Sequence, residues 1–219
     1  MRKKEPSLPE QRNYEYALTE AYKIAGERLN NADVQDVCRR SGAAHRDTAT
    51  QKIISLKYLG QSYHITLPGI EVLPADNREK ISQREKILIL HYLTWAKDNP
   101  LTQKQITFKE LPEGMSYFPT FYKRTIKPLV DYFGREPDRL PQVTDKFGGR
   151  RANYGDVSVT LSAFPHVPIT LVLWRGDTEL TPSGSILFDS SITDYLPTED
   201  IIVLSETITW KLVRALRQG

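Results

Sequence analysis

The chain has 219 residues, of which 39% are hydrophobic and 26% are charged, with 30 Lys and Arg residues against 27 Asp and Glu residues. This composition is typical of a globular protein and excludes a disordered or fibrous one. Because the charges nearly balance, they provide no basic stripe for a phosphate backbone, and we expect no nucleic-acid partner. The longest apolar run, residues 87–96, is too short to cross a bilayer and is interrupted by His91, so we expect no membrane partner.

The first residues are basic, but Pro9, Glu10 and Arg12 stand where a secretory signal would have its apolar core. We therefore expect a cytoplasmic protein with a basic, flexible segment at residues 1–12 and a single domain at residues 13–217.

Cys38 is the single cysteine, which excludes an internal disulfide and an iron–sulfur cluster held by this chain alone. It shares one face of a predicted helix with Val34 and Val37, so we interpret it as a packing residue.

In the N-terminal part, apolar residues at helical spacing predict a first amphipathic helix. These residues are Tyr14, Leu18, Ala21, Tyr22, Ala25 and Leu29. Asn31 is a candidate N-cap for a second helix that ends near Gly42. Alternating apolar residues at 54–58 and 63–67, separated by Gly60, predict a β-hairpin.

In the middle of the chain, Ser82 and Glu85 form the pattern of a capping box, which predicts a helix that ends before Pro100. A short strand is expected at residues 106–108. The next segment places a dense group of aromatic residues at a helix entrance: Tyr117, Phe118, Phe121 and Tyr122.

Prolines and glycines then divide the helical region that follows. Pro128 should kink or divide one helix and Gly134 should end it. Pro137, at a first-turn position, can open another helix that finishes at Gly148-Gly149.

The C-terminal part reads as a meander followed by a helix. Strands are predicted at residues 157–161, 169–174 and 185–188, and the second should be buried on both faces because its apolar run is nearly continuous. Thr198 can cap a last helix over residues 199–217. The chain is therefore expected to be an α+β protein with a mainly antiparallel sheet, formed by the hairpin and the C-terminal meander, packed with several amphipathic helices.

An ordered set of short motifs resembles a domain-of-unknown-function family of anaerobic bacteria and archaea. The motifs are Leu111-Pro112, Tyr117, Phe121, Pro128-Leu129, Phe133-Gly134, Gly148-Gly149, Gly155-Asp156, Pro165, Pro168, Leu173-Trp174, Gly176-Asp177, Phe188-Asp189 and residues 195–200. Some relatives join this domain to a cysteine-rich segment similar to that of corrinoid iron–sulfur proteins. The resemblance implies a place in anaerobic one-carbon or corrinoid metabolism, although this sequence has no such cysteine segment.

Eight residues are candidates for a ligand site: Tyr117, Phe118, Phe121, Trp174, Arg175, Asp177, Asp189 and Tyr195. Aromatic walls with an arginine nearby suit a planar cofactor that carries peripheral carboxylates, such as a corrinoid or a haem-like tetrapyrrole. His91 interrupts an apolar helix and is a weak candidate for an axial ligand. The alternatives are core packing for the aromatic residues and a hydrogen-bonded histidine with no ligand.

For each of two loops, the sequence is compatible with a ligand-binding role and with a purely structural role. Residues 148–151, with two glycines and two arginines, could bind an anion or could be a helix end followed by a turn. Residues 174–177 could hold a carboxylate or phosphate, or could form a turn with an internal ion pair.

The leading hypothesis is a cytoplasmic binding or accessory protein for a corrinoid, another tetrapyrrole or a protein that carries one. One alternative is a small-molecule enzyme that uses Asp177, Asp189 or His91 for proton transfer. The other is an interaction module that docks on a corrinoid protein or methyltransferase through an aromatic patch.

Overall fold

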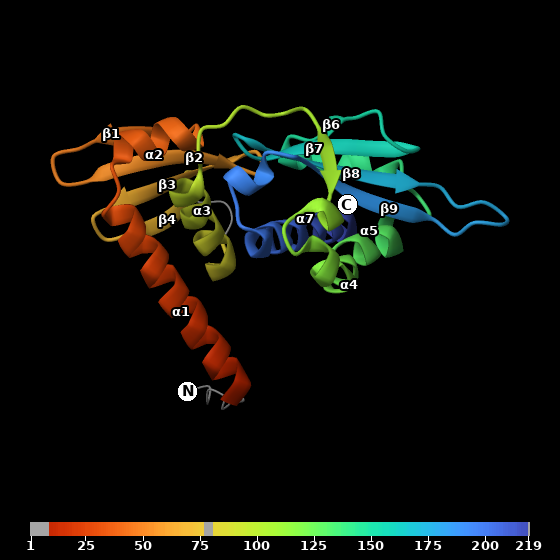
Figure 1. Ribbon diagram of the computed structural model, residues 1–219, viewed down its shortest axis with the longest axis horizontal. Coiled ribbons are helices and arrows are strands. Elements are labelled where there is room, and N and C mark those ends of the chain that lie inside the picture. Colours follow the sequence, from red (N-terminus) through yellow and green to blue (C-terminus); the bar gives the residue numbers. More distant parts are fainter. Residues whose placement is uncertain (1–8, 77–80, 219) are drawn as a thin grey trace.

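The computed structural model describes residues 9–76 and 81–218. Within them the chain forms two antiparallel β-sheets, each accompanied by its own helices (Figure 1). The predicted α+β class with antiparallel pairing is confirmed. None of the helices in these two ranges combines the length and the hydropathy that a membrane span requires.

Sheet A contains four strands in chain order: β1 (Ala44–Asp47), β2 (Lys52–Tyr58), β3 (Gln61–Leu67) and β4 (Glu71–Pro74). The predicted hairpin is the β2–β3 pair, in which Leu56 lies opposite Tyr63 and both side chains are buried. The two outer strands were not predicted. All four residues of β1 are exposed, so this strand carries no apolar alternation that could reveal it.

Sheet B has the strand order β5-β9-β8-β7-β6. Its strands are β5 (Gln105–Thr107), β6 (Arg150–Arg151), β7 (Val157–Phe164), β8 (Val167–Trp174) and β9 (Ser183–Asp189). The predicted meander is β7–β8–β9, and residues 169–173 of the central strand are buried on both faces, as expected from the apolar run.

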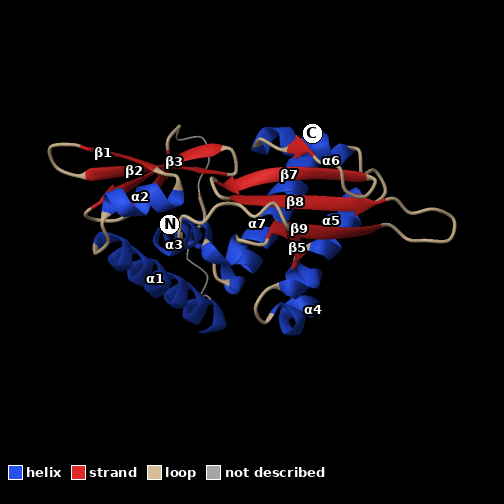
Figure 2. Ribbon diagram, turned by 45° about the horizontal axis from the view of Figure 1, so that its top comes forward, coloured by secondary structure: helices blue, strands red, loops and turns tan. Residues whose placement is uncertain are grey.

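Helices accompany each sheet (Figure 2). Sheet A is accompanied by α1 (Pro9–Asn30), α2 (Val34–Ser41) and α3 (Gln83–Trp95), and sheet B by α4 (Gly114–Arg124), α5 (Ile126–Phe133), α6 (Arg139–Thr144) and α7 (Thr198–Gln218). Short 3-10 turns are η1 (Phe108–Glu110), η2 (Asp145–Phe147) and η3 (Ile192–Asp194). Of the segment expected to be flexible, residues 1–8 lie outside the described residues and residues 9–12 begin α1.

Local capping chemistry explains where two helices begin. The Ser82 hydroxyl accepts a hydrogen bond from the backbone N–H of Glu85, and the Glu85 carboxylate accepts one from the backbone N–H of Ser82, which confirms the capping box. The predicted N-cap of α2 was wrong by two residues. Asp33 rather than Asn31 caps it, because its Oδ1 accepts from the backbone N–H of Gln35 at 2.8 Å.

The prolines divide the middle helices, and Gly134 ends α5 as predicted, but two other boundaries differ from the prediction. The break between α4 and α5 falls at Thr125, because the ring of Pro128 excludes the carbonyl of Arg124, four residues earlier. The next helix, α6, begins at Arg139, so Pro137 precedes it instead of occupying its first turn.

The two sheets share one hydrophobic core. Buried apolar residues of sheet A, sheet B and the helices form a single contiguous cluster. The backbone N–H of Leu59, in the β2–β3 turn, donates to the carbonyl of Ala163 in β7 at 3.0 Å, which ties the ends of the two sheets together. Cys38 lies in this core as predicted, and burial raises the pKa of its thiol to about 11.

Candidate functional site

The structure places the predicted aromatic wall residues of α4 at different depths. Phe121 is fully buried and its ring stacks on Phe108 with the centroids 4.0 Å apart. Phe118 is half-buried, and Tyr117 is exposed. Phe118 and Phe121 line a hollow of about 170 Å³, which is below the roughly 300 Å³ of the smallest pockets for drug-sized ligands. A tetrapyrrole does not fit this hollow.

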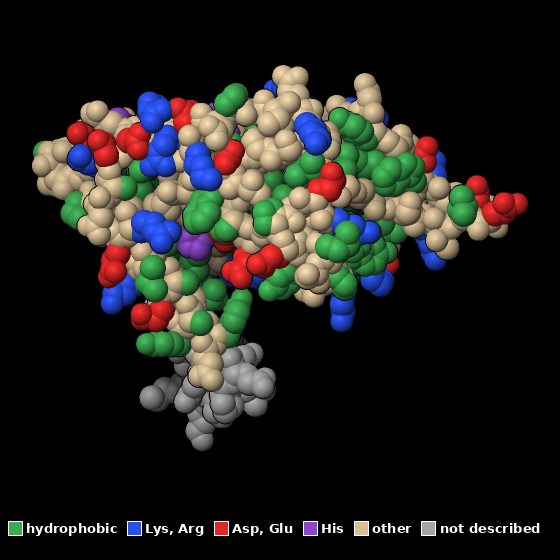
Figure 3. All heavy atoms as spheres, in the orientation of Figure 1, with side chains coloured by type: hydrophobic (Ala, Val, Ile, Leu, Met, Phe, Trp, Pro, Cys, Tyr) green, Lys and Arg blue, Asp and Glu red, His purple; other side chains and the backbone are tan. Residues whose placement is uncertain are grey.

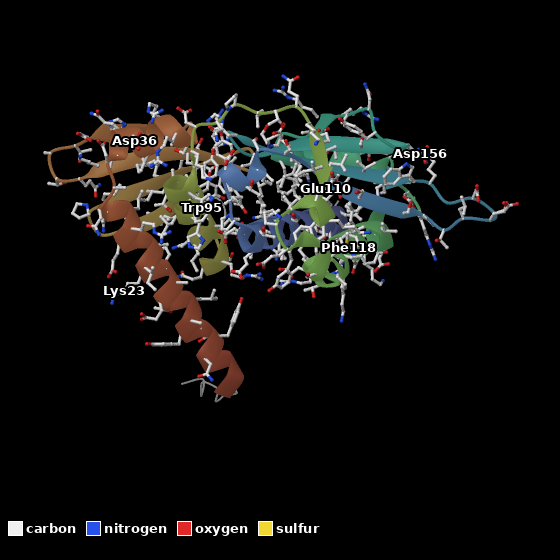
Figure 4. The ribbon with its side chains drawn as sticks, in the orientation of Figure 1. Lys23, Asp36, Trp95, Glu110, Phe118 and Asp156 are labelled. Carbon is white, nitrogen blue, oxygen red and sulfur yellow. The ribbon has the colours of Figure 1, made fainter. Side chains whose placement is uncertain are left out.

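Trp174, Arg175 and Asp177 lie in the β8–β9 hairpin; Trp174 is exposed, and the polar groups of Arg175 and Asp177 are engaged within the hairpin or beside it. The backbone N–H of Arg175 donates to Asp156, and its guanidinium forms an ion pair with Asp138 at 2.6 Å. Asp177 Oδ1 accepts from two backbone N–H groups of the same turn, which lowers the pKa of this carboxyl. Figure 4 shows Asp156, the partner of Arg175, and Phe118 at separate places, and the described lining of the hollow at Phe118 and Phe121 does not include Trp174, Arg175 or Asp177.

Asp189 is a buried carboxylate at the end of β9, with 3% of its surface exposed. Its two oxygens accept hydrogen bonds from the backbone N–H groups of Thr102, Gln103 and Ser191 and from the hydroxyls of Thr102 and Ser191. Burial alone would raise the pKa of this carboxyl, but the hydrogen bonds outweigh burial and lower it to about 2. Asp189 thus fastens the segment before β5 to the end of β9.

Tyr195 belongs to the core and not to a pocket wall. Its ring is fully buried and lies near the rings of Tyr92 and His166, at centroid distances of 6.2 and 5.3 Å. Its hydroxyl donates to the carbonyl of Asn99. Burial raises the pKa of this phenol.

His91 of α3 forms a pair with Asp200 of α7. Its Nδ1 lies 2.8 Å from Asp200 Oδ2, and the imidazole is partly exposed. This is the arrangement in which a carboxylate orients an imidazole for proton transfer. Among the described residues, however, no cluster of three or more His, Cys, Asp or Glu side chains could hold a metal ion. The pair joins the helices of the two sheets.

A groove between the two sheets was not identified as a whole from the sequence. We call it the inter-sheet groove; it is formed by the end of α2, the outer side of β2 and β3, the η2–β6 turn and the β7–β8 turn. Its volume is about 580 Å³, within the range of pockets that bind small molecules. Its polar lining residues are Ser55, Lys57, Ser62, Arg150 and Ser162.

Glycines in two turns allow the backbone of the β2–β3 turn to approach the backbone of the η2–β6 turn at this groove. Gly60 and Gly148 both have a positive φ, of 77° and 71°, and a Cβ on Gly60 would lie only 2.9 Å from the carbonyl oxygen of Phe147. A side chain at residue 60 would therefore separate the β2–β3 turn from the η2–β6 turn. The groove depends on this close approach.

We expect Gly60→Ala to destabilise the protein by at least about 2 kcal/mol, because it combines an unfavourable positive φ with the contact to Phe147. Gly69→Ala is the matched control: Gly69 has the same φ of 77°, but nothing lies within 4 Å of its Cβ position. The control should lose only about 1 kcal/mol. Urea unfolding measures both; equal losses would show that the contact with Phe147 contributes nothing.

The charged side chains among the described residues that line the groove are all positive. Lys57 and Arg150 are exposed, and neither forms an ion pair with any residue that the structure describes. None of the described lining residues is an Asp or a Glu. The Ser55 hydroxyl lies 3.1 Å from Nδ1 of His64, which holds it at the groove wall. The side chains that line the groove can donate hydrogen bonds to an anion, and the positive charges of Lys57 and Arg150 can attract it.

The sequence signal for this site was the run at residues 148–151. The structure places Gly148 and Arg150 in the groove and leaves Arg151 outside its lining. The sequence did not identify Lys57 and the three serines as site residues, because each looks like an ordinary outward-facing residue of a β-strand. Only the folded structure places them beside Arg150 of β6.

The fold and the groove define a two-sheet α+β protein with a basic site between its sheets. Residues 33–210 match the family model of a domain of unknown function, DUF3786. The chain therefore belongs to this family. The match begins beside α2 and ends within α7, so it includes both sheets and the whole inter-sheet groove. No curated protein and no solved structure matches the chain.

Proposed function

We propose that this protein is a cytoplasmic binding protein that holds an anionic small molecule in the inter-sheet groove. The observation that carries the proposal is the pairing of Lys57 and Arg150 in a hollow of about 580 Å³ whose described lining contains no carboxylate. Arg150 can bind a carboxylate or phosphate through two parallel N–H groups, and Lys57 supplies a point charge. The three serine hydroxyls of the groove can complete the coordination of such a group.

A corrinoid or another tetrapyrrole is one ligand of this class, and the resemblance to a family with corrinoid-linked relatives motivates its inclusion. Lys57 and Arg150 fit the propionates of a haem-like tetrapyrrole or the phosphate group of a corrinoid, whose ring side chains are mostly uncharged amides. None of the described lining residues is a His, Cys, Met or Tyr, so the groove offers no axial ligand for the metal. A tetrapyrrole would be held here by its periphery alone.

The alternative of a small-molecule enzyme is less well supported, because its candidate proton-transfer residues do not gather in one pocket. Asp177 accepts hydrogen bonds from backbone N–H groups of its own turn, and Asp189 accepts them from its own loop and from the segment before β5, so each has a structural role. The His91–Asp200 pair is the remaining acid–base group, and it lies between α3 and α7. Binding is therefore the function that the geometry supports best.

We expect inorganic phosphate, citrate, haem or cobalamin to raise the melting temperature of the protein in a saturable manner, because a ligand that binds the folded state stabilises it. Lys57→Gln or Arg150→Gln should weaken the binding of the active ligand by about tenfold, the loss expected for one charge-assisted hydrogen bond. Thermal shift and calorimetric titration measure these effects.

Arg151→Gln is the matched control, since Arg151 is the exposed neighbour of Arg150 on the same strand but does not line the groove. It should bind like the parent protein. Saturable binding that persists unchanged in the Lys57→Gln/Arg150→Gln double variant, or no response to any of the four ligands, would contradict the proposal.

A further inference from the structure

The outer face of α4 carries an apolar stripe that is separate from the inter-sheet groove. Met115, Phe118 and Tyr122 follow one another at spacings of three and four residues, which places them on one side of the helix. Met115 is 67% exposed and Tyr122 is 43% exposed. We call these three residues the α4 patch. Exposed apolar side chains gathered in this way are typical of an interaction surface.

Two hollows share Tyr122 in their lining. The first hollow, of about 170 Å³, lies between α4 and β9 and is lined by Phe118 and Ile186, among other residues. The second hollow, of about 500 Å³, lies between α5 and the β8–β9 hairpin and is lined by Val130 and Pro182, among other residues. The surface can therefore accept two apolar anchors, one in each of two neighbouring hollows, as in many protein–peptide interfaces.

The surroundings of these hollows are basic. Lys109 Nζ lies 4.2 Å from the centre of the Phe118 ring, and Arg135 is exposed and forms no ion pair with a described residue. Asp131 is the one carboxylate among the described residues that line the two hollows, and Lys127 neutralises it at 2.6 Å. Figure 3 shows hydrophobic side chains with Lys and Arg side chains around them over α4 and α5.

This charge decides between the occupants of the surface. A second copy of the chain docking through the same patch would bring these cations together, which is unfavourable. A segment with carboxylates would satisfy Arg135 and Lys109 while its apolar residues fill the hollows. We propose that the α4 patch binds an acidic peptide segment of a partner protein that inserts one apolar side chain into each of the two hollows that Tyr122 lines.

The test is selection of a phage-displayed library of short random peptides on the immobilised full-length protein. Enriched peptides should combine Asp or Glu with two apolar residues, and fluorescence anisotropy should show weaker binding as the salt concentration rises. Tyr122→Ala should weaken binding at least about tenfold, as at an interface hot spot. Arg135→Glu should do the same, and selection on this variant should enrich Lys or Arg instead.

Tyr16→Ala and Arg46→Glu are the controls, because both residues are exposed and lie on α1 and β1, away from the α4 patch. They should bind the selected peptides like the parent protein, and so should Arg150→Gln, whose change affects only the inter-sheet groove. Circular dichroism verifies that each variant is folded.

The proposal is overturned if no peptide is enriched, if the enriched peptides lack acidic residues, or if they bind Tyr122→Ala and Arg135→Glu as tightly as the parent. Self-association of the parent in sedimentation experiments that disappears in Tyr122→Ala would assign the surface to a second copy and would also overturn it.

Discussion

Replacing Asp189 by Ala should lower the free energy of unfolding by about 3 kcal/mol at neutral pH. The change leaves the backbone N–H groups of Thr102, Gln103 and Ser191 without their acceptor, and a buried unsatisfied donor costs about 1–3 kcal/mol. Asp189→Asn should lose somewhat less, because one amide oxygen can still accept. Urea unfolding followed by circular dichroism measures both variants.

The pH dependence of stability gives a sharper form of this prediction. The folded-state pKa of Asp189, about 2, lies below its ordinary value of 3.8, so the carboxylate stabilises the fold above pH 4 and this contribution is lost as the pH falls towards 2. The shift corresponds to about 2 kcal/mol. Between pH 4 and pH 2 the parent should therefore lose about this amount more than the Asn variant, because the other carboxyls with a lowered pKa, such as Glu206, titrate in both proteins.

Asp47→Asn is the control for both experiments, because Asp47 is an exposed carboxylate on an outer strand. It should unfold like the parent at both pH values. If Asp189→Asn lost as much stability between pH 4 and pH 2 as the parent, the carboxylate would not be the group responsible.

Elements whose signals are local could be predicted from the sequence. The capping box at Ser82 and the alternation on both sides of Gly60 identify a helix start and a hairpin because the interacting groups are a few residues apart. The outer strands of sheet A could not be identified in this way. Their partners come from β2 and β3; β1 is exposed at all four residues, and β4 is only four residues long with Val72 as its one buried residue.

The candidate site depends on contacts between distant residues. Asp189 has a distinctive motif, but its partners Thr102 and Gln103 lie 86–87 residues earlier, so the sequence could not distinguish a ligand-binding carboxylate from a structural one. The inter-sheet groove is a similar case. Arg150 belonged to a recognisable anion-binding pattern, whereas Lys57 became part of the site only because sheet A and sheet B meet at Gly60.

The second large effect is expected at a buried ion pair between α3 and α7. Glu85 is buried, its carboxylate lies 3.2 Å from Lys211 Nζ, and it also accepts from Ser82. The nearby Tyr58 is fully buried, and burial together with the Glu85 carboxylate raises the pKa of its phenol well above the usual value. Glu85 thus connects α3, through Lys211, to the last helix of the chain.

Glu85→Ala or Lys211→Met should each lower the free energy of unfolding by about 3 kcal/mol, because removing one partner leaves the other charge with little solvent in a mostly buried position. The Glu85→Ala/Lys211→Met double variant should lose less than the sum, with a coupling energy of at least about 1 kcal/mol. The same cycle on the exposed Lys127–Asp131 pair is the control and should give a coupling close to zero. Additive losses at Glu85 and Lys211 would show that the two side chains stabilise α3 and α7 independently, and that the ion pair does not hold the helices of the two sheets together.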